Sequence, residues 1–591
     1  MAVLFGHNGA PMADPVVTVA DLLRPAFAAV GGEGADPVVR PSDRADAQAN
    51  GALPIAKALG QKNPRQVAEA VLAAAGPALE GVCSEVEIAG PGFLNLTFAD
   101  EFLAEQLTEA VGDERLGVRT APVAKRVVID YSAPNVAKEM HVGHLRTTVI
   151  GDALTRMMTF VGHTVVRENH IGDWGTPFGM LIEHLIDLGE TAAAEELSLG
   201  DLDTFYRQAR ASFDADPAMQ DRARQRVVLL QGGDPETMRL WHLLVEQSTK
   251  HFNAVYVELG VLLTDDDLAG ESSYNDLLPD VVERLRAAGL LEESDGADVV
   301  FPPGFTNREG EPLPLIVQKR GGGFNYATSD LACVIDRIER VHGDLLLYVV
   351  GAPQAQHFSM VFKVAEMAGW LRPPAHAVHV MFGSVLGPDR KMLKSRSGEP
   401  LKFIDLLDEA VERAAKAVAA KNPNLSAEEQ KEIARIVGIG AVKYADLSTD
   451  RIKDYIFDWD RMLAFDGNTA PYLQYAHARI CSIFRRAEID RAAVRGTSQI
   501  TLGAPQERAL AIRLLAFDSA VWDTIDKYSP HRLCTYLFDL AQDFTAFYEH
   551  CSVLKAEDEA VKQSRLALCD ATARILATGL GLLGITAPER M

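Results

Sequence analysis

Two histidines, His141 and His144, stand shortly after a strand-like run, VVID at residues 127–130, and Gly143 lies between them. Ligands of parallel sheets bind beyond the carboxyl ends of the strands, where helix N-termini present unpaired N–H groups. Two imidazoles at such an edge can donate hydrogen bonds to oxygens whose negative charge grows during attack on phosphorus. The glycine lets a nucleotide approach the backbone. The pattern predicts a nucleotide phosphate site, although histidines at helix starts also serve as packing or capping groups.

A second group of residues that could take part in catalysis lies in the loop RKMLKSRSG, residues 390–398. This loop follows the strand-like run HVMFGSVLG. The loop contains Lys391, Lys394 and Ser395. A basic loop of this kind suits the β- and γ-phosphates of ATP and the departing pyrophosphate. For an isolated lysine pair, a solvated surface loop is the alternative interpretation.

The elements that must position these residues follow a strand and helix alternation. Buried β-branched runs alternate with amphipathic helical patterns from Val127 to about residue 189, and the alternation resumes at residues 344–387. This pattern is typical of an α/β fold with a doubly wound parallel sheet, a split Rossmann-like domain. A charged, mostly helical insertion is expected at about residues 190–315. The histidines and the lysine loop then belong to the two halves of one divided nucleotide-binding domain.

Modules are expected on both sides of this domain, because 591 residues exceed what one hydrophobic core supports. Residues 1–118 mix helical and strand-like segments joined by Gly90-Pro91-Gly92 and predict an α+β module. The catalytic domain is expected at residues 119–438. Nearly everything after residue 403 has a helical pattern, with capping-box spacing at Ser426 and Glu429. Residues 439–591 are therefore predicted to form a helical bundle.

Composition limits the class of protein. The apolar runs are shorter than the roughly 18 residues a membrane span needs, and the N-terminus lacks the pattern of a secretory signal, so a cytoplasmic enzyme is expected. The six cysteines are dispersed without zinc-ligand spacing, so no zinc and no disulfide framework are expected. The net charge of −24 argues against a polyanionic partner on average, but local basic faces can exist on an acidic protein.

HVGH and KMLKS resemble the two signature motifs of the class I aminoacyl-tRNA synthetases. Further segments resemble the arginyl-tRNA synthetase family in particular, and they span nearly the whole chain: DYSAPNVAKEMHVGHLR, NHIGDWGTPFGML, FNYATSDLA, GAVKYADLS, DYIFDWDRMLAFDGNTAPYLQYAHARI and the terminal APERM. The resemblance implies that arginine and ATP, accompanied by Mg²⁺, form arginyl-adenylate and pyrophosphate. A hydroxyl of the terminal adenosine of tRNA then takes the arginyl group, and AMP is released.

The same resemblance implies roles for individual residues. His141 and His144, with Gly143, would bind ATP and stabilise the charge that develops at the α-phosphate. Lys391 and Lys394, with Ser395, would do so for pyrophosphate. The arginine-binding residues would be the following: Asp130, Asn135, His170, Tyr326, Asp330 and Gln354. A guanidinium needs carboxylates and amide oxygens, which this set supplies. For Asp330, a helix N-cap before LACVIDRIER is the alternative role.

Three positions depart from the family pattern. Pro177 stands where Gln is common, GAPQ at residues 351–354 replaces an Asp-x-Arg-Gln run, and Leu393 stands where Ser is frequent. Local geometry near the amino acid is therefore expected to differ, while the histidines and lysines remain.

The helical C-terminal module resembles an anticodon-binding domain. In it, Tyr472 and Tyr475 could stack on splayed bases and Arg479 could meet phosphates. The two tyrosines are three residues apart, so packing in the bundle core is the alternative for at least one of them. The resemblance further implies that the N-terminal module contacts tRNA, that the protein is a monomer, and that tRNA binding precedes activation.

Parts of the sequence are also compatible with other functions. A nucleotidylyltransferase outside the synthetases would explain HxGH, but it would not need the C-terminal helices or the arginine-binding set. A catalytically silent paralogue that binds RNA is disfavoured by the presence of both histidines and both lysines. Another cognate amino acid, lysine above all, would also use carboxylates.

Overall fold

The computed structural model describes residues 14–591, apart from 61–62, 190–201, 321, 392, 394–400, 422–424 and 496–498. The chain folds into two compact units. We call Val123–Leu463 with Leu583–Ile585 the central unit. The terminal unit contains the chain up to Pro122, Ala464–Leu582 and Thr586–Met591.

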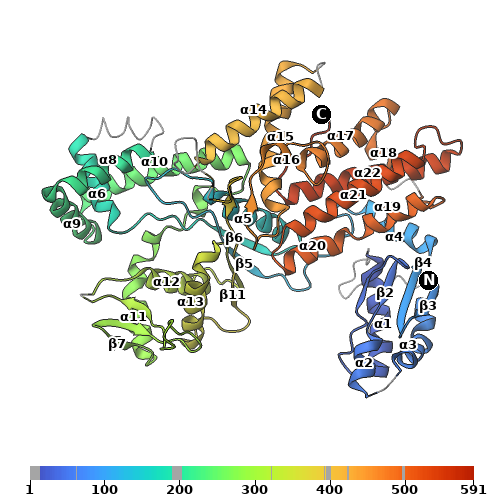
Figure 1. The fold of residues 1–591 in the computed structure, drawn as a ribbon, viewed down its shortest axis with the longest axis horizontal. Coiled ribbons are helices and arrows are strands. Elements are labelled where there is room, and N and C mark those ends of the chain that lie inside the picture. The colour runs from blue at the N-terminus through green and yellow to red at the C-terminus, as the bar shows by residue number, and fades with distance from the viewer. Residues whose placement is uncertain are drawn as a thin grey trace. The chain divides into compact units, whose positions relative to one another are not determined.

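The central unit is built on a parallel sheet in the order β11-β10-β5-β6 (Figure 1). Its strands are β5 (Arg126–Asp130), β6 (Thr164–Glu168), β10 (Leu345–Tyr348) and β11 (His376–His379). The chain leaves β5 through α5 (Gly143–Phe160) and reaches β6 on one side. It later returns through α12 (Tyr326–Glu339) to β10 on the other side and passes through α13 (Ala355–Met367) to β11. The strand order thus reverses between β5 and β10, which is where doubly wound sheets bind ligands. The predicted split, doubly wound sheet is confirmed.

Helix α5 packs closely on the chain that leaves β5. Most of its residues are buried, polar ones such as Thr148 included, and Leu145, Val149 and Leu154 are fully buried. Gly151 is required at the contact, because a Cβ there would lie 2.3 Å from Cγ of Tyr131.

Helices and short strands separate the two halves of the sheet. The helical elements are α6 (Pro177–Leu188), α8 (Leu202–Ala215), α9 (Pro217–Gln231), α10 (Pro235–Leu259), η1 (Asp265–Asp267), η2 (Glu271–Leu277) and α11 (Leu278–Ala287). A small antiparallel sheet follows, formed by β7 (Glu292–Ser294), β8 (Ala297–Val300) and β9 (Leu315–Gln318). The expectation of a mostly helical insertion missed this sheet. Val300 and Val317 share a hydrophobic core with Val281 of α11, Leu331 of α12 and Val361 of α13.

The 3-10 turn η3 (Ala352–Gln354) lies between β10 and α13. The elements after β11 complete the central unit: β12 (Val385–Leu386), α14 (Phe403–Lys421), α15 (Ala427–Leu447), β13 (Tyr455–Ile456) and α16 (Trp459–Met462). The predicted capping box is present, because Ser426 Oγ accepts the N–H of Glu429 and the Glu429 carboxylate accepts the N–H of Ser426. Helices α14 and α15 cross closely at Gly438, where a Cβ would lie 2.8 Å from the carbonyl of Ala410. The predicted module boundary after residue 438 falls inside α15.

The N-terminal part of the terminal unit is an α+β module, as predicted. It comprises α1 (Pro15–Gly31), β1 (Val39–Pro41), β2 (Ala47–Ala49), α2 (Ala52–Ala58), α3 (Pro64–Leu79), β3 (Cys83–Ala89), β4 (Phe93–Phe98) and α4 (Asp100–Gly112). The strands pair antiparallel in the order β1-β2-β4-β3, and the turn between β3 and β4 contains Gly90 and Gly92, both with positive φ. The Gly-Pro-Gly signal therefore located a hairpin turn correctly.

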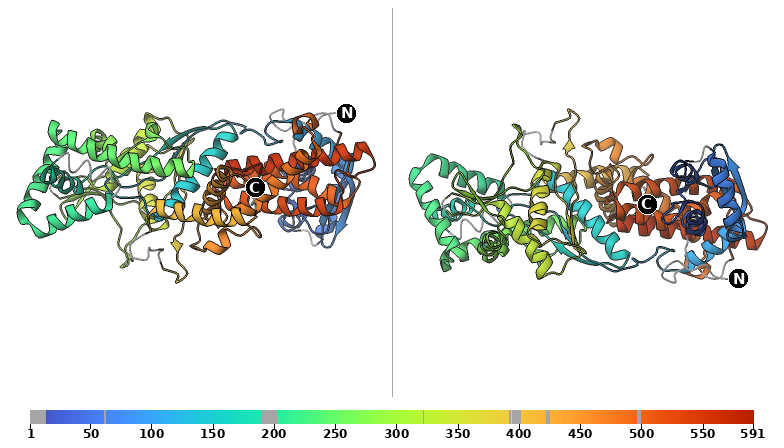
Figure 2. Two further views of the ribbon diagram at one scale, coloured as in Figure 1. Left: turned by 90° about the horizontal axis from the view of Figure 1, so that it is seen from above. Right: turned by 90° about the horizontal axis from the view of Figure 1, so that it is seen from below.

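The rest of the terminal unit is a helical bundle, which confirms the predicted fold of this segment. Its helices are α17 (Ala470–Ala487), α18 (Arg491–Val494), α19 (Pro505–Leu515), α20 (Phe517–Asp526), α21 (His531–His550) and α22 (Glu559–Leu582). The long helices α21 and α22 pack side by side (Figure 2). Of the helices in the described ranges, none has both the length and the apolar character required to cross a membrane.

Candidate active site

The last residues of the four neighbouring strands form one row at the carboxyl edge of the sheet. Glu168, Asp130, Tyr348 and His379 are successive register partners. Arg337 of α12 lies beneath this row and is 1% exposed. It donates from Nε to Glu168 (2.7 Å) and from Nη2 to Asp130 (2.9 Å), and its guanidinium lies over the ring of Tyr348. Arg337 therefore fixes the ends of β5 and β6 and compensates the charge of Asp130, a predicted arginine-binding residue.

The loop between β5 and α5 has a strained backbone that the insertion helix α10 supports. Ser132, Ala133 and Ala137 have φ values of 75°, 48° and 59°. Non-glycine residues persist in this conformation where the surrounding structure fixes them. Ser248 of α10 accepts the N–H of Ala137 at 2.9 Å, and the hydroxyl of Tyr256 lies 2.8 Å from Ser132 Oγ. The insertion thus holds the backbone that leads to the histidines.

Buried polar groups on the sheet side hold the same loop. Asn169, at the end of β6, accepts the N–H of Ala133 through Oδ1 and donates through Nδ2 to the hydroxyl of Tyr256. From α5, Thr147 accepts the N–H of Ser132 and donates to the carbonyl of Val349, just after β10. The loop is therefore bonded to the chain segments after both β6 and β10, at the position where the strand order reverses.

The predicted histidine pair is brought together at the start of α5. The ring centroids of His141 and His144 lie 4.2 Å apart. Gly143 makes this possible, because a Cβ there would lie 2.6 Å from the His141 ring. The side chain of His141 is exposed and that of His144 is half-buried, so the pair lies at the surface of the central unit.

Backbone hydrogen bonds set the tautomers of both imidazoles. His141 Nδ1 accepts the N–H of Gly143 at 3.0 Å, and His144 Nδ1 accepts the N–H of His141 at 3.1 Å. A neutral ring whose Nδ1 accepts carries its hydrogen on Nε2. Neighbouring atoms remove part of the water around the His141 imidazole and lower its pKa, although its side chain reaches the surface. Burial, together with the neighbouring His141, lowers the pKa of His144 to about 3. At neutral pH the pair offers Nε2–H donors without a full positive charge.

The chain that follows the predicted lysine loop joins the histidine segment directly. The N–H of Val142 donates to the carbonyl of Leu401 at 3.0 Å, and the N–H of Phe403 donates to the carbonyl of Met140 at 2.9 Å. This short antiparallel pairing places residues 401–403, which follow the lysine loop in the sequence, beside HVGH, although the two motifs lie about 250 residues apart.

Lys391 lies on the upstream side of that loop. Its carbonyl accepts the N–H of Gly387 at 2.8 Å and its own N–H donates to Asp389 Oδ1, so the backbone is held in a tight turn with the lysine exposed. Lys394 and Ser395 lie outside the described residues.

Asn135 and His170, two predicted arginine-binding residues, come from the loops after β5 and β6. The loops pair at Asn135 and Gly172, and a Cβ on Gly172 would lie 2.4 Å from Asn135 Oδ1. The half-buried ring of His170 has Nδ1 2.9 Å from the carbonyl of Ala269 and lies 5.7 Å from the ring of Tyr274.

Tyr326 and Asp330 lie one turn apart on α12. The helix begins at Tyr326 with Asn325 as its N-cap, so Asp330 is an interior residue and the helix-cap alternative for it is wrong. Asp330 Oδ2 lies 2.5 Å from Nε2 of His357 on α13. The ring of Tyr326, which is 66% exposed, leans on the same histidine with a centroid distance of 4.8 Å. Gln354, in η3 before α13, is exposed.

Sequence reasoning missed residues that contact or surround these groups. His357 stands three residues after Gln354 in GAPQAQH, and its helical position beside α12 was not evident from the sequence. Glu271 comes from η2 in the insertion. Burial raises the pKa of Glu271, and Asp173 and Asp330 are near enough to add to this shift. The site therefore gathers more acidic groups than the motifs alone indicated.

Other residues of the NHIGDWGTPFG segment are structural supports. The Asp173 carboxylate accepts the N–H and hydroxyl of Ser272, and its carbonyl accepts Nε1–H of Trp241. The ring of Trp174 meets Trp241 edge-on, and Phe178 is buried. These contacts attach the insertion to the loop after β6.

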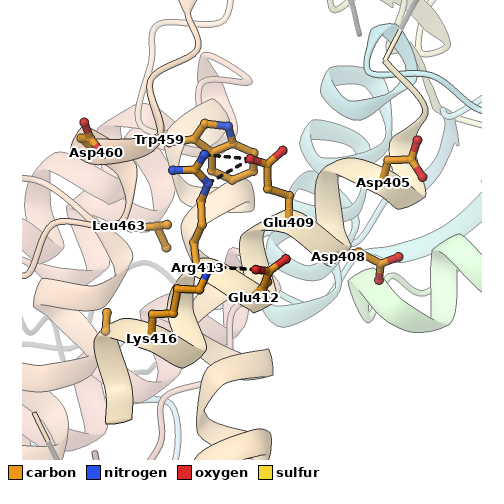
Figure 3. A pocket seen from close by; sticks show the side chains of 10 residues that line it. Asp405, Asp408, Glu409, Glu412, Arg413, Lys416, Trp459, Asp460 and Leu463 are labelled. Atoms are coloured by element: carbon orange, nitrogen blue, oxygen red, sulfur yellow. Dashed lines mark hydrogen bonds and ion pairs between the residues drawn. The ribbon is translucent and has the colours of Figure 1, made fainter. Parts of the chain in front are cut away.

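A separate groove of about 960 Å³ lies along α14 and α16 (Figure 3). Its charged lining consists of Asp405, Asp408, Glu409, Glu412, Asp460, Arg413 and Lys416. Arg413 is bonded to Glu409 and lies over the ring of Trp459, while Lys416 is bonded to Glu412. Carboxylates dominate the lining, so the groove does not suit a triphosphate.

The predicted tRNA-binding residues lie on α17 in the terminal unit. Tyr472 is half-buried against Phe538, whereas Tyr475 is 44% exposed. The guanidinium of Arg479 lies 4.6 Å from the ring centre of Tyr548. The packing alternative therefore describes Tyr472 better than Tyr475.

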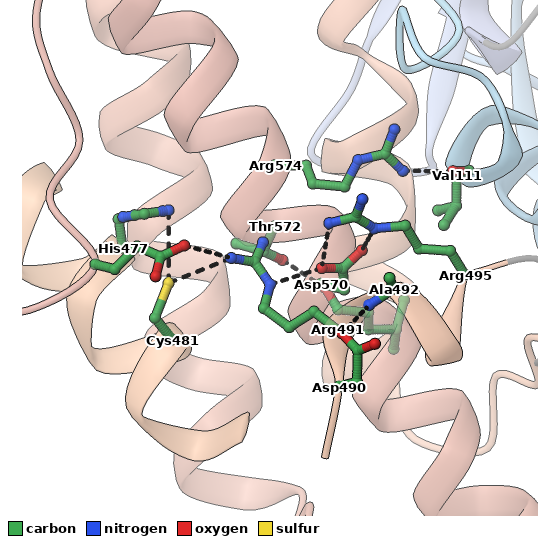
Figure 4. Close-up of polar contacts among 12 residues, drawn as sticks. Val111, His477, Cys481, Asp490, Arg491, Ala492, Arg495, Asp570, Thr572 and Arg574 are labelled. Atoms are coloured by element: carbon green, nitrogen blue, oxygen red, sulfur yellow. Dashed lines mark hydrogen bonds and ion pairs between the residues drawn. The ribbon is translucent and has the colours of Figure 1, made fainter. Parts of the chain in front are cut away.

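Other polar residues near the end of α17 hold the bundle together (Figure 4). His477 Nδ1 lies 2.9 Å from the carbonyl of Pro588. Arg491 and Arg495 both donate to the buried carboxylate of Asp570, and Arg574 donates to the carbonyl of Val111 at the end of α4.

Comparison with known proteins agrees with this arrangement. The family model for the catalytic domain of class I (R) tRNA synthetases matches residues 106–459. The DALR anticodon binding domain matches residues 473–591, and the arginyl-tRNA synthetase N-terminal domain matches residues 18–98. The fold and the histidine site thus define a class I aminoacyl-tRNA synthetase.

Full-length relatives show which family within this class the chain resembles. An arginine–tRNA ligase of Thermobifida fusca is 55% identical over 98% of this chain and all of that protein, and one of Edwardsiella ictaluri is 49% identical over 97% and 99%. Two solved structures are similar over nearly the whole chain. The arginyl-tRNA synthetase of Plasmodium falciparum has a TM-score of 0.83 and 27% identity, and the match covers 98% of this chain and 99% of that one. The enzyme of Thermus thermophilus has a TM-score of 0.81 and 26% identity, and the match covers 98% of this chain and 100% of that one. The chain belongs to the arginyl-tRNA synthetase family.

Proposed function

We propose that this protein attaches L-arginine to tRNA(Arg) in two steps at the carboxyl edge of the parallel sheet. In the first, the arginine carboxylate attacks the α-phosphorus of ATP, and pyrophosphate leaves. In the second, a hydroxyl of the terminal adenosine of tRNA attacks the carbonyl carbon of arginyl-adenylate, and AMP leaves. Neither step requires a covalent bond to the protein.

The observation that carries this proposal is the pair of Nε2–H donors at the N-terminus of α5. Negative charge on the α-phosphate oxygens increases as the carboxylate attacks, and fixed donors stabilise that charge more than they stabilise the ground state. His141 and His144 are fixed by backbone hydrogen bonds to Nδ1, so their donor atoms need no reorganisation. The N-terminus of α5 adds a favourable dipole.

The lysine loop acts on the other end of the triphosphate. Lys391, Lys394 and Ser395 bind the β- and γ-phosphates and stabilise the leaving pyrophosphate. The pairing of Leu401 and Phe403 with the HVGH segment supports this role, because it brings the loop to the same edge. Mg²⁺ arrives with ATP and is held by the phosphates. In the residues with described placement, His, Cys, Asp and Glu do not cluster as a metal site would require.

The amino acid lies beside the phosphates, between the loops after β5 and β6 and helix α12. Asp330 accepts hydrogen bonds from the guanidinium, Tyr326 forms a wall, and Asn135, His170 and Gln354 orient the polar ends. Asp130 shapes this pocket while its charge is shared with Arg337. Rejection of neutral amino acids follows, because they would leave these polar groups unpaired.

The remaining parts of the proposal concern tRNA and the protein's setting. Tyr475 stacks on an anticodon base, while Tyr472 and Arg479 support that surface or contact the backbone. The modules 1–118, 119–438 and 439–591 bind tRNA, carry out the chemistry and bind the anticodon, respectively. We further propose that the protein is a cytoplasmic monomer.

A charging assay tests the function. Purified protein with ATP, Mg²⁺ and bulk tRNA is expected to make radiolabelled arginine acid-precipitable, whereas each of the other amino acids gives background counts. Charging of lysine or of any other amino acid in place of arginine would overturn the proposed specificity.

A further inference from the structure

We propose that His357 is a positioning residue for arginine recognition, which aims the Asp330 carboxylate at the guanidinium. This inference rests on the proposed role of Asp330 in binding the guanidinium. His357 itself is not expected to touch arginine.

His357 contacts both α12 residues that are assigned to the arginine pocket. Its Nε2 lies 2.5 Å from Asp330 Oδ2, and its ring centre lies 4.8 Å from that of Tyr326. The side chain of His357 is 15% exposed and that of Asp330 is 18% exposed, so the pair is largely shielded from water. A short hydrogen bond in such surroundings fixes one carboxylate oxygen and leaves Oδ1 to accept from a ligand.

The contact with His357 decides which way the Asp330 carboxylate faces. A histidine with hydrogen on Nε2 donates to Oδ2 of Asp330 and leaves Oδ1 for the guanidinium of arginine. Without this hydrogen bond the carboxylate can rotate, so the affinity for arginine should fall.

Other ionisable groups near this pair must be separated from its effect. On α12, Tyr326 faces His357, and Cys333 lies near enough to Asp330 to feel its charge. Glu271 of η2 also senses Asp330 and His170. On the sheet side, His379 contacts Phe358, the residue after His357. Variants of His357 are therefore needed to separate its contribution from those of these groups.

Steady-state charging kinetics of the full chain with varied arginine and varied ATP test the positioning role. For His357→Ala at pH 8, we expect KM for arginine to rise about tenfold, because a hydrogen bond to a charged group is lost. KM for ATP and kcat are expected to change less than about twofold. If KM for arginine, KM for ATP and kcat all worsened by the same factor, the variant would have a general structural defect, and this result would contradict the proposal.

The hydrogen bond is tested with His357→Gln, whose amide N–H can donate to Asp330. We expect its KM for arginine to stay within about threefold of the wild-type value, because the hydrogen bond to the carboxylate is kept. A rise of about tenfold or more in a folded glutamine variant would overturn the proposal, even if the alanine variant failed to fold.

His342→Asn provides a matched histidine control, because His342 lies exposed just beyond the C-terminal end of α12. This variant should keep the wild-type KM for arginine, and a rise of about tenfold there would also contradict the inference. The assay distinguishes a failure of the proposed function from a failure of the proposed role of His357. Failure of the wild type to charge arginine would refute the proposed function, whereas normal charging with unaltered variants would refute only the role of His357.

Discussion

At the residue scale, the two imidazoles of HVGH work as hydrogen-bond donors and not as cations. Burial lowers the pKa of both rings, and the pKa of His144 falls to about 3. The backbone N–H groups of Gly143 and His141 occupy Nδ1, which leaves Nε2–H to donate. Neutral donors add little attraction for ground-state ATP, so their contribution is concentrated in the transition state.

Replacement of His144 by Ala should lower kcat for charging by about a hundredfold, which is typical for the removal of one transition-state donor. The far-ultraviolet circular dichroism spectrum should not change. His163→Ala is the control, because His163 accepts the N–H of Lys125 near the opposite edge of the sheet. Similar rates for His144→Ala and the wild type would show that the role of His144 is misassigned.

Residue types within motifs could be predicted from the sequence, but their partners could not. HVGH indicated phosphate chemistry because its residues are adjacent in the chain. Arg337 and His357 act through residues 207 and 27 positions away, respectively, and these contacts arise only when α12 packs on the sheet and α13. The N-cap alternative for Asp330 failed for a local reason, because Asn325 begins the helix earlier.

At the element scale, α5 is connected to α15 by a buried ion pair. Arg146 Nε lies 3.1 Å from Asp446 Oδ2, with both side chains at most 1% exposed, and Arg146 also donates to the carbonyl of Lys453. Lys443 of α15 donates to the carbonyl of Leu259 at the end of α10. These contacts link the helix that carries the histidines to the insertion and to the helices that follow the sheet.

The Asp446 carboxyl should give a measurable pH dependence of stability. Burial raises its pKa from 3.8 to about 6, although Arg146 acts in the opposite direction. A raised folded-state pKa means that the stabilising contribution is present below about pH 4 and is lost as the pH rises through about 6. The unfolding free energy of the wild type relative to Asp446→Asn should therefore fall by about 2 kcal/mol from pH 4.5 to 7, measured by urea denaturation. A constant difference over this range would contradict the assignment.

The crossing of α14 and α15 can be tested at Gly438. A Cβ there would meet the backbone of Ala410, so Gly438→Ala should destabilise the protein by about 1–2 kcal/mol and lower Tm by a few degrees, despite the better helix propensity of alanine. Gly581→Ala in α22 is the control, because a Cβ there meets no atom within 4 Å. Differential scanning calorimetry should show little change or a slight gain for the control. A higher Tm for Gly438→Ala would mean that the helices cross less closely.

At the scale of the whole molecule, an acidic chain must bind a polyanion. The net charge of −24 repels tRNA on average, so binding depends on local arginines such as the exposed Arg485 and Arg486 on α17. The acidic groove along α14 and α16 is expected to remain free of RNA. Acidic and basic side chains are therefore concentrated in different regions, which the net charge of the whole chain does not show.

The salt dependence of KM should differ between tRNA and arginine. Counterion release makes log KM for tRNA rise with log KCl, with a slope of at least about 2 if several phosphates are contacted. KM for arginine should change far less, because binding one guanidinium releases no row of counterions from a polyanion. Charging kinetics at 50–250 mM KCl measure both, and a flat response for tRNA would contradict phosphate contacts by these arginines.

The sequence predicted the large pattern of the fold better than its small parts. Continuous apolar strands and long amphipathic helices gave the split sheet and the C-terminal bundle. The short strands β7, β8 and β9 were missed because runs of three or four residues carry little periodicity and were surrounded by helical patterns. The pairing of Leu401 with Val142 could not be inferred either, because it depends on the folded sheet.

The central claim is that the histidine pair, the lysine loop and the Asp330 pocket surround one set of substrates at the edge where the strand order reverses. A crystal structure with arginine and a non-hydrolysable ATP analogue tests it most directly. We predict α-phosphate oxygens within hydrogen-bond distance of Nε2 of His141 or His144, and the guanidinium at Asp330 Oδ1. Triphosphate density away from both histidines, or a guanidinium that does not meet Asp330, would contradict the account.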